Sequence, residues 1–414
     1  MKYCLIGEKL GHSYSAELHR AMGVDYSLVE VAQSALADFM RGNDYDGFNV
    51  TIPYKKAVIP YLDGLDESAK VCGAVNTVKR VGDKLVGYNT DLGGMRYMIE
   101  SKGATLAGKH VLILGSGGTS GTAQALAKQM GAASVNVVAL DGQINYANCY
   151  DLTDTEVIIN ATPVGMYPNV YEKLVDLARF ARYGRLTAVF DCIYNPFCTD
   201  LLLEAKSLGL VCNDGLPMLV RQAVLAENIW KGQNDDTRLT EKLVSYLRAQ
   251  RANLVLFGMP STGKTTLGKL LAKKLNKPFV DLDEYLTAKH GKSPAEIISE
   301  HGENFFRKME SDAVAEIAPY SGYVISLGGG TVLDPDNVAK LKKNGVLIYL
   351  NRDLSLLSTD NRPLSQIHGV EKLFAERSAI YQKVKDAEVQ NNGDLTTVTK
   401  EIEKAYEIAC NKWS

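Results

Sequence analysis

Residues 253–265 read NLVLFGMPSTGKT, and this stretch decides the fold of the C-terminal part of the chain. An apolar run of strand length leads into a G-x-x-x-x-G-K-T loop, and a helical pattern follows. Backbone N–H groups of such a loop surround phosphate oxygens, Lys264 adds a positive charge, and the Thr265 hydroxyl can bind Mg²⁺. A glycine-rich turn that only caps a helix is the alternative, which the flanks disfavour. The residues expected to bind ATP are Gly258, Ser261, Thr262, Gly263, Lys264, Thr265 and Thr266.

Composition bounds the rest of the chain. With 414 residues the chain has room for two or three domains. A net charge of −2, spread over both halves, argues against a nucleic-acid or membrane-surface partner. The sequence has neither an apolar run of about 20 residues nor a signal-peptide pattern. The seven cysteines are scattered and form no C-x-x-C pair, as expected for reduced thiols in a cytoplasmic protein. A homo-oligomer is compatible with the sequence.

Strand and helix patterns alternate along the whole chain, which predicts an α/β fold with mostly parallel sheets. A polar run at 231–237 leads into a short charged helix, and a new strand begins at Asn253, so we expect a boundary near residue 250. The expected domains are 1–100, completed by helices from about 216–248, then 101–215, and finally 252–414.

A second glycine-rich loop follows the apolar strand at 110–114. The sequence Gly115-Ser116-Gly117-Gly118-Thr119 precedes a helical pattern, like the first strand-to-helix turn of a dinucleotide-binding fold. Gly115 permits the tight turn, and Gly117 lets the backbone approach a pyrophosphate. Alone this signal is weak, because many α/β proteins have such a turn without a ligand. Gly115, Gly117, Gly118 and Thr119 are the candidate cofactor residues.

The end of the next strand bears on the choice of cofactor. We expect a strand at 135–140 followed by Asp141. An acidic residue there hydrogen-bonds a ribose 2′-OH, whereas an arginine accommodates a 2′-phosphate. No Lys or Arg occurs between Lys128 and Lys173. The pattern therefore leans toward NAD, with a plain turn at Asp141-Gly142 as the alternative.

Polar clusters recur in residues 1–95. They are Ser13-Tyr14-Ser15, Asn49-Val50-Thr51-Ile52-Pro53-Tyr54-Lys55, Gly73-Ala74-Val75-Asn76-Thr77 and Asn89-Thr90-Asp91. Strand alternation puts Asn49 and Thr51 on one face. Singly, each cluster has a structural explanation: Ser15 and Asp91 as helix N-caps, Lys55 as a solvated residue early in a helix.

Together these hydroxyls, amides, lysine and carboxylate suit a small polyhydroxylated acid beside a nucleotide. The lysine could donate a proton as hydride arrives, and the aspartate could hold the lysine in place.

These motifs closely resemble the shikimate dehydrogenase family over residues 1–248. The match includes S-x-S, N-V-T-I-P-x-K, G-A-V-N-T, N-T-D and G-x-G-G, then Asn160-Ala161-Thr162-Pro163-x-Gly165-Met166 and Gly215-Leu216-Pro217-Met218-Leu219-Val220-x-Gln222. The resemblance implies a substrate-binding domain and a Rossmann-like NAD(P)-binding domain. It implies that Lys55 and Asp91 are the catalytic pair. The substrate residues it implies, with Asn49 added from the strand face, are Ser13, Ser15, Thr51, Asn76, Asp91, Tyr194, Gly215 and Gln222.

The chain departs from this family at two places. Ala16 replaces the usual proline at the start of the first helix, which should be tolerated. The N-R-T-x-x-R segment that grips the NADP phosphate is missing, and Leu140-Asp141-Gly142 stands in its place. NADP remains the cofactor that the family implies, and NAD is the alternative.

The C-terminal part resembles the shikimate kinase family from about 252 to 405. Its P-loop is followed by Asp281 and Asp283, by Arg307 with Glu310, by a triple glycine at 328–330, by Asn361-Arg362-Pro363-Leu364, and by Arg377 with Tyr381. A strand period of two would send both aspartates to one side, one toward Mg²⁺ and one toward the accepting hydroxyl. An exposed i, i+3 pair is the alternative for Arg307 and Glu310.

The kinase resemblance assigns roles residue by residue. Asp283, Arg307, Gly329 and Arg377 would hold shikimate, Lys264 and Arg362 would serve the phosphoryl group, and Thr265 and Asp281 would serve the metal. Lys264, Asp283 and Arg362 are the expected catalytic residues. The segment before Arg362 is shorter than usual and lacks the arginine that covers adenine in the family.

The two halves predict consecutive reactions. Reduction of 3-dehydroshikimate would give shikimate, and ATP with Mg²⁺ would then phosphorylate its 3-hydroxyl. Two alternatives stay open: a quinate/shikimate dehydrogenase using NAD, or one half as a catalytically silent binding module.

Overall fold

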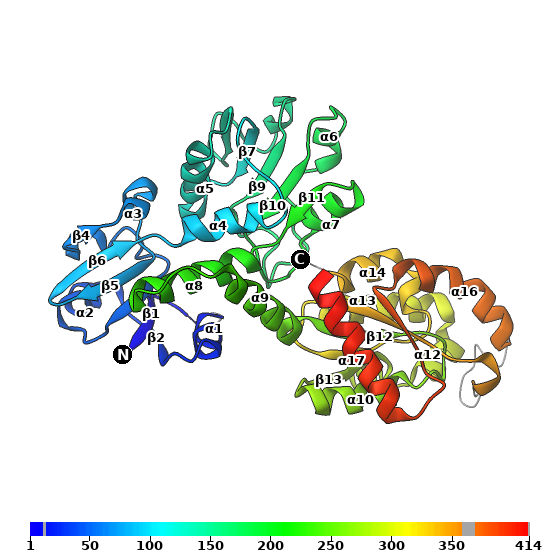
Figure 1. Cartoon of the computed structure of the whole chain (residues 1–414). Helices are drawn as coiled ribbons and strands as arrows, with labels where there is room; N and C mark the ends of the chain where they lie inside the picture. Colours follow the sequence, from blue (N-terminus) through cyan, green and yellow to red (C-terminus); the bar gives the residue numbers. More distant parts are fainter. Residues whose placement is uncertain (11–13, 358–368, 413–414) are drawn as a thin grey trace. The chain divides into compact units, whose positions relative to one another are not determined.

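The computed structural model describes residues 1–10, 14–357 and 369–412. Contacts divide the chain into two compact units, Met1–Tyr194 with Thr199–Val244, and Asn195–Cys198 with Ser245–Ser414. The division falls inside helix α9 (Thr237–Arg251), a few residues before the expected boundary. The α/β class is confirmed, since three sheets alternate with helices along the chain (Figure 1). Within the described ranges, no helix has the length and apolarity to cross a membrane.

The first unit opens with a mixed six-stranded sheet in the order β2-β1-β3-β5-β6-β4. β1 pairs in parallel with β2 and β3, while β5 is antiparallel to both β3 and β6. Apolar side chains such as Ile6, Phe48 and Val78 are fully buried and form its core with α2 and α3. The elements are β1 (Tyr3–Gly7), α1 (Ser15–Ala21), β2 (Tyr26–Glu30), α2 (Leu36–Gly42), β3 (Gly47–Val50), β4 (Gly64–Leu65), α3 (Glu67–Cys72), β5 (Thr77–Val81) and β6 (Lys84–Tyr88), with 3₁₀ turns at Gln33–Ala35 and Ile59–Tyr61.

A second sheet of five parallel strands follows, in the order β11-β10-β9-β7-β8. The strand order reverses between β7 and β9, and in such sheets ligands bind beyond the carboxyl ends of the strands at that point. Gly115 lies there with φ 100°, and a Cβ on it would come within 2.6 Å of Thr162. The elements are α4 (Asp91–Glu100), β7 (His110–Leu114), α5 (Gly118–Gln129), β8 (Ser134–Val138), a 3₁₀ turn (Cys149–Asp151), β9 (Val157–Asn160), α6 (Leu177–Ala181), β10 (Ala188–Asp191), α7 (Asp200–Ser207) and β11 (Val211–Asn213).

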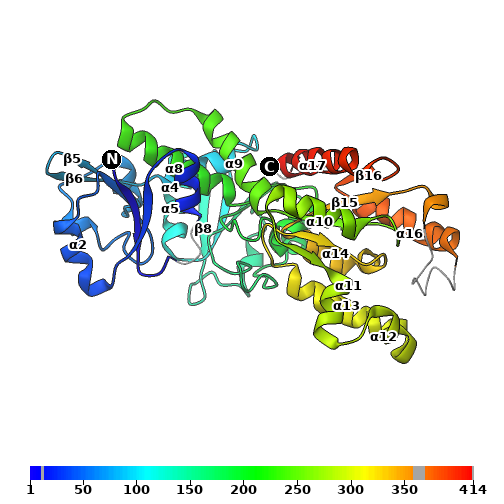
Figure 2. The ribbon, with the colours of Figure 1, turned by 90° about the horizontal axis from the view of Figure 1, so that it is seen from below.

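Helix α8 (Leu216–Lys231) returns the chain to the first sheet. It lies beside α4 in both ribbon views and also contacts α1 and β5 (Figures 1 and 2). The two helices approach closely because α4 carries Gly93 and Gly94, and a Cβ on Gly94 would lie 2.6 Å from the Met218 carbonyl oxygen. This packing fixes the N-terminus of α4, where Asp91 lies.

The second unit has a five-stranded parallel sheet in the order β13-β14-β12-β15-β16. Helices α10 and α17 contact each other, and α17 also lies against β15 and β16. A buried apolar cluster that includes Phe257, Ile325 and Tyr349 joins the sheet to α11, α13 and α16. The elements are β12 (Asn253–Phe257), α10 (Lys264–Leu275), β13 (Phe279–Asp281), α11 (Leu282–His290), α12 (Pro294–His301), α13 (Glu303–Ile317), β14 (Val324–Ser326), α14 (Pro335–Leu341), β15 (Gly345–Asn351), α16 (Val370–Val384), β16 (Ala387–Gln390) and α17 (Leu395–Lys412), with 3₁₀ turns at Thr331–Leu333 and Leu354–Leu356.

A buried lysine ties the last turn of α9 to this unit. The Lys277 ammonium donates to the carbonyl oxygens of Ala249 and Ala252, both at 2.8 Å, and to the Tyr406 hydroxyl at 2.9 Å. Burial lowers the pKa of Lys277 to about 8. The carbonyls at a helix C-terminus attract cations, which suits an ammonium at this position.

Several local interpretations were wrong, among them the structural alternatives for Ser15, Asp91 and Lys55. Ser15 and Asp91 are not N-caps, because Tyr14 and Thr90 occupy the cap positions and helices begin at the residues after them. Lys55 lies in a turn rather than in a helix. β3 ends at Val50, so strand alternation does not reach Thr51. β8 ends at Val138, which leaves Asp141 in a tight turn after the strand.

The aspartates of the second unit also differ from expectation. Asp281 ends β13 and caps α11 by accepting from the backbone N–H groups of Asp283 and Glu284. Asp283 therefore lies in the first turn of a helix and not on the strand, so the strand-period argument was wrong for this pair.

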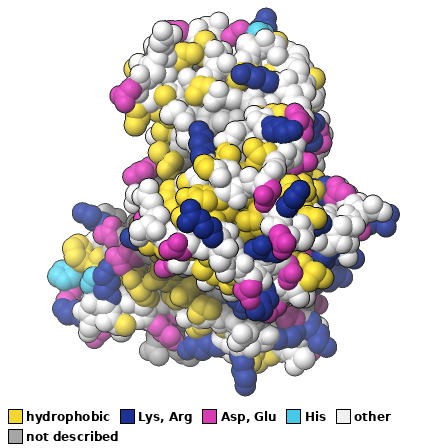
Figure 3. Space-filling model, turned by 90° about the vertical axis from the view of Figure 1, so that its left-hand side faces the viewer, with side chains coloured by type: hydrophobic (Ala, Val, Ile, Leu, Met, Phe, Trp, Pro, Cys, Tyr) yellow, Lys and Arg dark blue, Asp and Glu magenta, His cyan; other side chains and the backbone are white. Residues whose placement is uncertain are grey.

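Charged side chains of both signs are interspersed on the face shown in Figure 3. This mixture agrees with the near-zero net charge, and that face has no field of one sign that would attract a polyanion.

Candidate active sites

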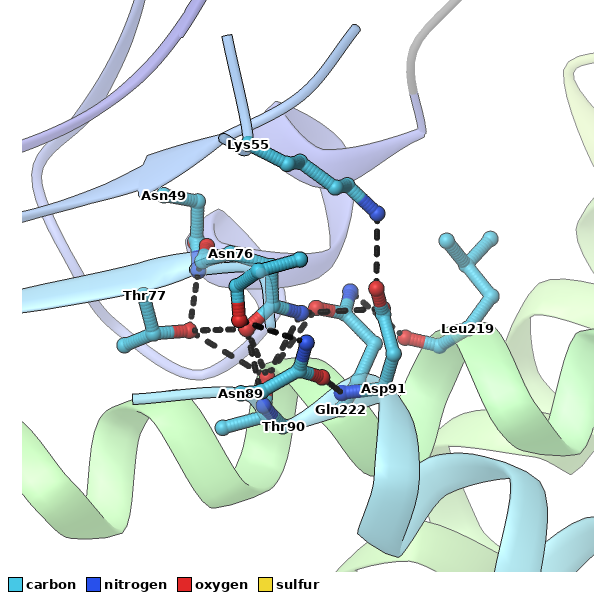
Figure 4. Close-up of polar contacts among 10 residues, drawn as sticks. Asn49, Lys55, Asn76, Thr77, Asn89, Thr90, Asp91, Leu219 and Gln222 are labelled. Atoms are coloured by element: carbon cyan, nitrogen blue, oxygen red, sulfur yellow. Dashed lines mark hydrogen bonds and ion pairs between the residues drawn. The ribbon is translucent and has the colours of Figure 1, made fainter. Parts of the chain in front are cut away.

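A close ion pair marks the first site. Lys55 Nζ lies 2.6 Å from Asp91 Oδ2, and the two side chains are 29% and 14% exposed (Figure 4). The turn after β3 supplies the lysine, and the first residue of α4 supplies the aspartate. A carboxylate is favoured at this helix end by the helix dipole. The expected pair is thus assembled from two elements and remains accessible to a ligand.

Asn76 holds the other oxygen of Asp91. Its Nδ2 donates to Asp91 Oδ1 at 2.9 Å and to Thr90 Oγ1 at 3.0 Å, while its Oδ1 accepts from the Thr90 backbone N–H at 2.8 Å. Because the backbone N–H can only donate, it fixes which end of the Asn76 amide faces Asp91.

Of the other expected substrate residues, Gln222 contacts the network around this pair. Gln222 on α8 has its Oε1 3.5 Å from Thr90 Oγ1, and its Nε2 donates to Leu219 O. Tyr194 follows β10, with its ring centroid 5.2 Å from that of Tyr14. A Cβ on Gly215 would lie 2.1 Å from the Cys192 carbonyl oxygen, so no side chain fits at 215. Ser15 begins α1, Thr51 follows β3, and Ser13 lies outside the described residues.

Asn49 differs from these residues. It is only 5% exposed, and all hydrogens of its amide have partners within the protein: Nδ2 donates to Asn76 O and Thr77 Oγ1. Its Oδ1 accepts from the Tyr26 hydroxyl. The amide therefore has no free donor for a ligand.

The glycine-rich loop between β7 and α5 belongs to the same unit. Gly117 is the N-cap of α5, and Gly118 and Thr119 form its first turn, so their N–H groups point out of the helix end. Asp191 and Asn160 end neighbouring strands β10 and β9, and the Asn160 Nδ2 donates to Asp191 Oδ1 at 2.9 Å. The Asp191 carboxyl also accepts from Thr199 Oγ1 and from the Ile193 N–H, and burial raises its pKa to about 7. One buried carboxyl, that of Asp191, thus joins the end of β9 to the segment that follows β10.

Asp141 is exposed in the turn after β8, and the neighbouring Leu140 is 84% exposed. The loops after β8 and β9 carry no Lys or Arg from 129 to 172. The loop after β8 therefore supplies no cation to a 2′-phosphate, and the one lysine in the loop after β9, Lys173, pairs with Glu204 at 2.7 Å.

The P-loop of the second unit has the geometry that its sequence predicts. Gly263 precedes α10 with φ 87°, a value that favours glycine. Lys264 is 8% exposed, and its ammonium donates to the carbonyls of Gly258 and Met259. Thr265 Oγ1 donates to Asp281 Oδ2 at 2.6 Å. Hydroxyl and carboxylate oxygens side by side are the ligands that Mg²⁺ prefers, so this pair fits a Mg²⁺ site.

Next to this loop, two arginines meet at the triple glycine. A Cβ on Gly330 would lie 2.4 Å from Arg307 Nη2, and one on Gly329 would lie 3.2 Å from Arg377 Nη1 and 3.0 Å from Pro260 of the P-loop. A Cβ on Gly328 would lie 3.4 Å from Asp283 Oδ1. Asp283, Arg307 and Arg377 are therefore grouped beside the P-loop as expected, while Arg362 lies outside the described residues.

Arg307 and Glu310 are not an exposed pair. Arg307 Nη1 donates to Glu310 Oε2 at 2.6 Å, and the Glu310 side chain is only 2% exposed. Its other oxygen accepts from Thr331 Oγ1 at 2.6 Å. Glu310 thus binds the Arg307 guanidinium on its buried side. On the exposed side, Glu303 Oε1 lies 2.9 Å from Arg307 Nη2.

Sequence reasoning missed three contributors. Tyr26 and Thr77 lie in the hydrogen-bond network behind Asn76, and Asn391 donates to the carbonyl oxygen of P-loop residue Thr262 at 2.7 Å. Thr77 stands inside the G-A-V-N-T cluster, so its position could have been noticed. Tyr26 and Asn391 lie far from every motif and gave no signal.

Fold and sites together define a nicotinamide-type oxidoreductase unit joined to a P-loop phosphotransferase unit. Residues 5–78 match the shikimate dehydrogenase substrate-binding domain, and residues 260–407 match shikimate kinase. The chain belongs to the shikimate dehydrogenase family and continues into a shikimate kinase domain, which makes it a bifunctional shikimate-pathway enzyme.

Individual relatives cover the first unit. The shikimate dehydrogenase (NADP(+)) of Methanococcus maripaludis is 36% identical over 271 residues, which is 58% of this chain and 95% of the relative. A Thermus thermophilus shikimate 5-dehydrogenase in complex with NADP(H) and shikimate is 28% identical, with a TM-score of 0.52 over 59% of this chain and 98% of that one. A Listeria monocytogenes shikimate 5-dehydrogenase in complex with shikimate and NAD is 26% identical, with a TM-score of 0.53 over 59% and 96%.

Proposed function

We propose that this chain reduces 3-dehydroshikimate to shikimate with a nicotinamide cofactor and then phosphorylates the 3-hydroxyl of shikimate with ATP and Mg²⁺. The contact between Lys55 and Asp91 carries the first half of the proposal. Reduction adds a hydride to the ketone carbon and a proton to its oxygen. The Lys55 ammonium donates that proton, and Asp91 holds the ammonium at the carbonyl. A bound nicotinamide supplies the hydride.

The grouping of Asp283, Arg307 and Arg377 at the triple glycine supports the second half. The planar forks of the two arginines suit the shikimate carboxylate. Asp283 then accepts the proton of the attacking hydroxyl, and Lys264 neutralises charge on the transferred phosphoryl group. Thr265 and Asp281 would hold the Mg²⁺ that ATP brings.

A coupled assay tests both steps on the intact chain. With 3-dehydroshikimate, reduced nicotinamide and Mg-ATP, shikimate 3-phosphate should form, as detected by mass spectrometry. Lys55→Ala should abolish nicotinamide oxidation and leave phosphorylation of added shikimate unchanged, and Lys264→Ala should do the reverse. If either half of the wild-type chain shows no turnover, that half is a binding module.

NAD is the second candidate cofactor, favoured by Asp141 and by the absence of Lys and Arg from residues 129–172. The NADP named for the Methanococcus maripaludis relative and the NAD bound by the Listeria monocytogenes protein support one candidate each. Initial rates with NADPH and with NADH decide between the two cofactors. Each cofactor is measured with 3-dehydroshikimate and with 3-dehydroquinate, the ketone that corresponds to quinate. A larger kcat/KM for NADH and 3-dehydroquinate would make the first unit a quinate/shikimate dehydrogenase.

A further inference from the structure

A chain of hydrogen bonds leads from the edge strand β2 to the catalytic pair. The Tyr26 hydroxyl donates to Asn49 Oδ1 at 2.7 Å, and Asn49 Nδ2 donates to Thr77 Oγ1 at 3.0 Å. Since Thr77 Oγ1 accepts there, its own proton is free to be donated to Asn76 Oδ1 at 3.1 Å. Asn76 Nδ2 then donates to Asp91 Oδ1 at 2.9 Å. Figure 4 shows the steps from Asn49 to Asp91 and Lys55.

The chain is buried along most of its length. Tyr26, Asn49, Asn76 and Thr77 are each at most 6% exposed. In such surroundings water cannot replace a lost partner, and hydrogen bonds in series strengthen one another. A change at Tyr26 therefore reaches Asp91 through three amide and hydroxyl groups.

The Tyr26 ring packs against two other aromatic side chains. Its ring stacks on His19 with centroids 3.9 Å apart and an interplanar angle of 10°, and Trp230 lies at 6.4 Å. His19 Nδ1 is 2.7 Å from Glu227 Oε1 on α8. Burial raises the pKa of Tyr26 well above 10, so its hydroxyl keeps its proton and acts as the donor. The end of the chain farthest from the site is thus a rigid aromatic cluster.

We propose that Tyr26 and Asn49 are positioning residues for the Lys55–Asp91 pair, and that Asn49 does not bind the substrate. The inference rests on the proposed reduction, because it concerns the residues that deliver the proton. Both amide hydrogens of Asn49 are committed to the network, so the residue acts through Asn76. Small displacements of a catalytic group slow the chemical step more than they weaken binding.

Tyr26→Phe tests the inference with a matched control. The variant leaves Asn49 Oδ1 without its donor, and we expect kcat for reduction to fall about tenfold with KM changed less than about twofold. Tyr3→Phe is the control: Tyr3 stacks on Trp230 in the same cluster, but its hydroxyl contacts the Met1 sulfur and not Asn49. The control should keep the wild-type kcat. Equal losses in both variants would overturn the proposal, because they would reflect the cluster and not the hydrogen bond.

Two further variants separate positioning from substrate binding. Thr77→Val should lower kcat as Tyr26→Phe does, and Thr77→Ser should restore it. Asn49→Ala should also lower kcat with little change in KM. A severalfold rise in KM at unchanged kcat would make Asn49 a substrate ligand and overturn the proposal. The melting temperature of the first unit, unchanged from wild type, shows that this unit is folded in each variant, and an unchanged kinase rate shows the same for the second unit.

One readout needs no turnover, so it stands even if the proposed reduction fails. In crystals of the Tyr26→Phe variant we expect Asn76 Nδ2 to lose its 2.9 Å contact with Asp91. An unchanged contact would overturn the inference. Absence of reduction by the wild-type chain would contradict the proposed function alone.

Discussion

At the scale of single residues, the state of a buried carboxyl depends on the groups that contact it. Asp191 and Glu310 are both hidden from solvent, yet one has only neutral hydrogen-bond donors while the other pairs with Arg307. A buried carboxyl without a nearby cation keeps its proton to higher pH. Two predictions follow from this contrast.

The first concerns pH. Burial raises the pKa of Asp191 from 3.8 to about 7, so between about pH 4 and 7 the folded chain binds a proton that the unfolded chain has lost. The free energy of unfolding of the first unit should therefore fall as pH rises through this window, by about 1.4 kcal/mol per pKa unit. Asp191→Asn keeps an acceptor for Ile193 N–H and should flatten this dependence. Urea midpoints at pH 5 and 8 measure it, and Asp83→Asn on an exposed turn is the control.

If Asp191→Asn loses stability equally at both pH values, the carboxyl is ionised in the folded chain and the prediction is wrong. A midpoint that is lower at pH 5 than at pH 8 in the wild-type chain would contradict it as well.

The second prediction concerns Glu303, whose carboxylate lies on the exposed side of the Arg307 fork. In the proposed kinase reaction the substrate carboxylate displaces Glu303 from Arg307, and an ion pair this exposed is worth about 1 kcal/mol or less. Glu303→Gln should lower the shikimate KM of the kinase up to about fivefold at unchanged kcat. Glu310→Gln should raise KM instead, because Glu310 orients Arg307 from the buried side. Initial rates at saturating Mg-ATP measure both, and a higher KM in Glu303→Gln would contradict the argument.

Sequence motifs predicted the charged pair of the first site better than the role of the buried Asn49 amide. Lys55 and Asp91 each had a structural explanation when taken singly, and they were identified because their motifs together match those of the shikimate dehydrogenase family. Asn49 stands in the same motif, but its role depends on Tyr26 in another strand, and no local pattern reveals that partner. The roles predicted for the carboxylates of Asp281 and Asp283 rested on a wrong local structure, because helix capping overrode the strand period, and these roles stay predictions.

At the scale of elements, the site depends on how closely α4 and α8 approach. The N-terminus of α4 presents Asp91, and α8 presents Gln222. Strand-loop-helix order was predictable for both nucleotide loops, since each has an apolar strand before the glycines. The return of helices from about 216–248 to the first domain was expected only from the family resemblance, because helices so far apart leave no shared pattern in the sequence.

Two neighbouring glycines on α4 test this packing. A Cβ on Gly94 would meet the Met218 backbone oxygen at 2.6 Å, whereas one on Gly93 would meet only the mobile Leu225 side-chain end at 2.6 Å. Gly94→Ala should push the helices apart, lower the melting temperature of the first unit and reduce its kcat at least tenfold. Gly93→Ala is the matched control and should stay within about threefold of wild type, since alanine favours a helix over glycine. Equal effects of the two substitutions would contradict this account of the packing.

At the scale of the whole molecule, the first unit has two sheets and the second has one, and each unit has its own buried core and nucleotide loop. Units built in this way unfold separately unless a large apolar interface joins them. The number of units and their order were predictable from the two glycine-rich loops. The place of the division was not, because α9 is one continuous helix whose sequence has no break at residue 245.

Calorimetry should therefore show two thermal transitions with separate ligand responses. A ligand that binds only folded protein stabilises its own unit by about 2.7 kcal/mol at a hundredfold excess over Kd. Mg-ADP should raise one melting temperature and an oxidised nicotinamide the other. A single transition that responds to both ligands would show that the units unfold together.

The Lys277 contact has a consequence for anyone who wishes to produce the kinase by itself. A fragment begun at Asn253 would match the start of the strand but would discard Ala249 and Ala252, whose carbonyls receive the interior ammonium. A fragment begun at Ser245 would retain them. We expect the shorter piece to express poorly or aggregate, because it lacks the two carbonyl oxygens that accept hydrogen bonds from the buried Lys277 ammonium.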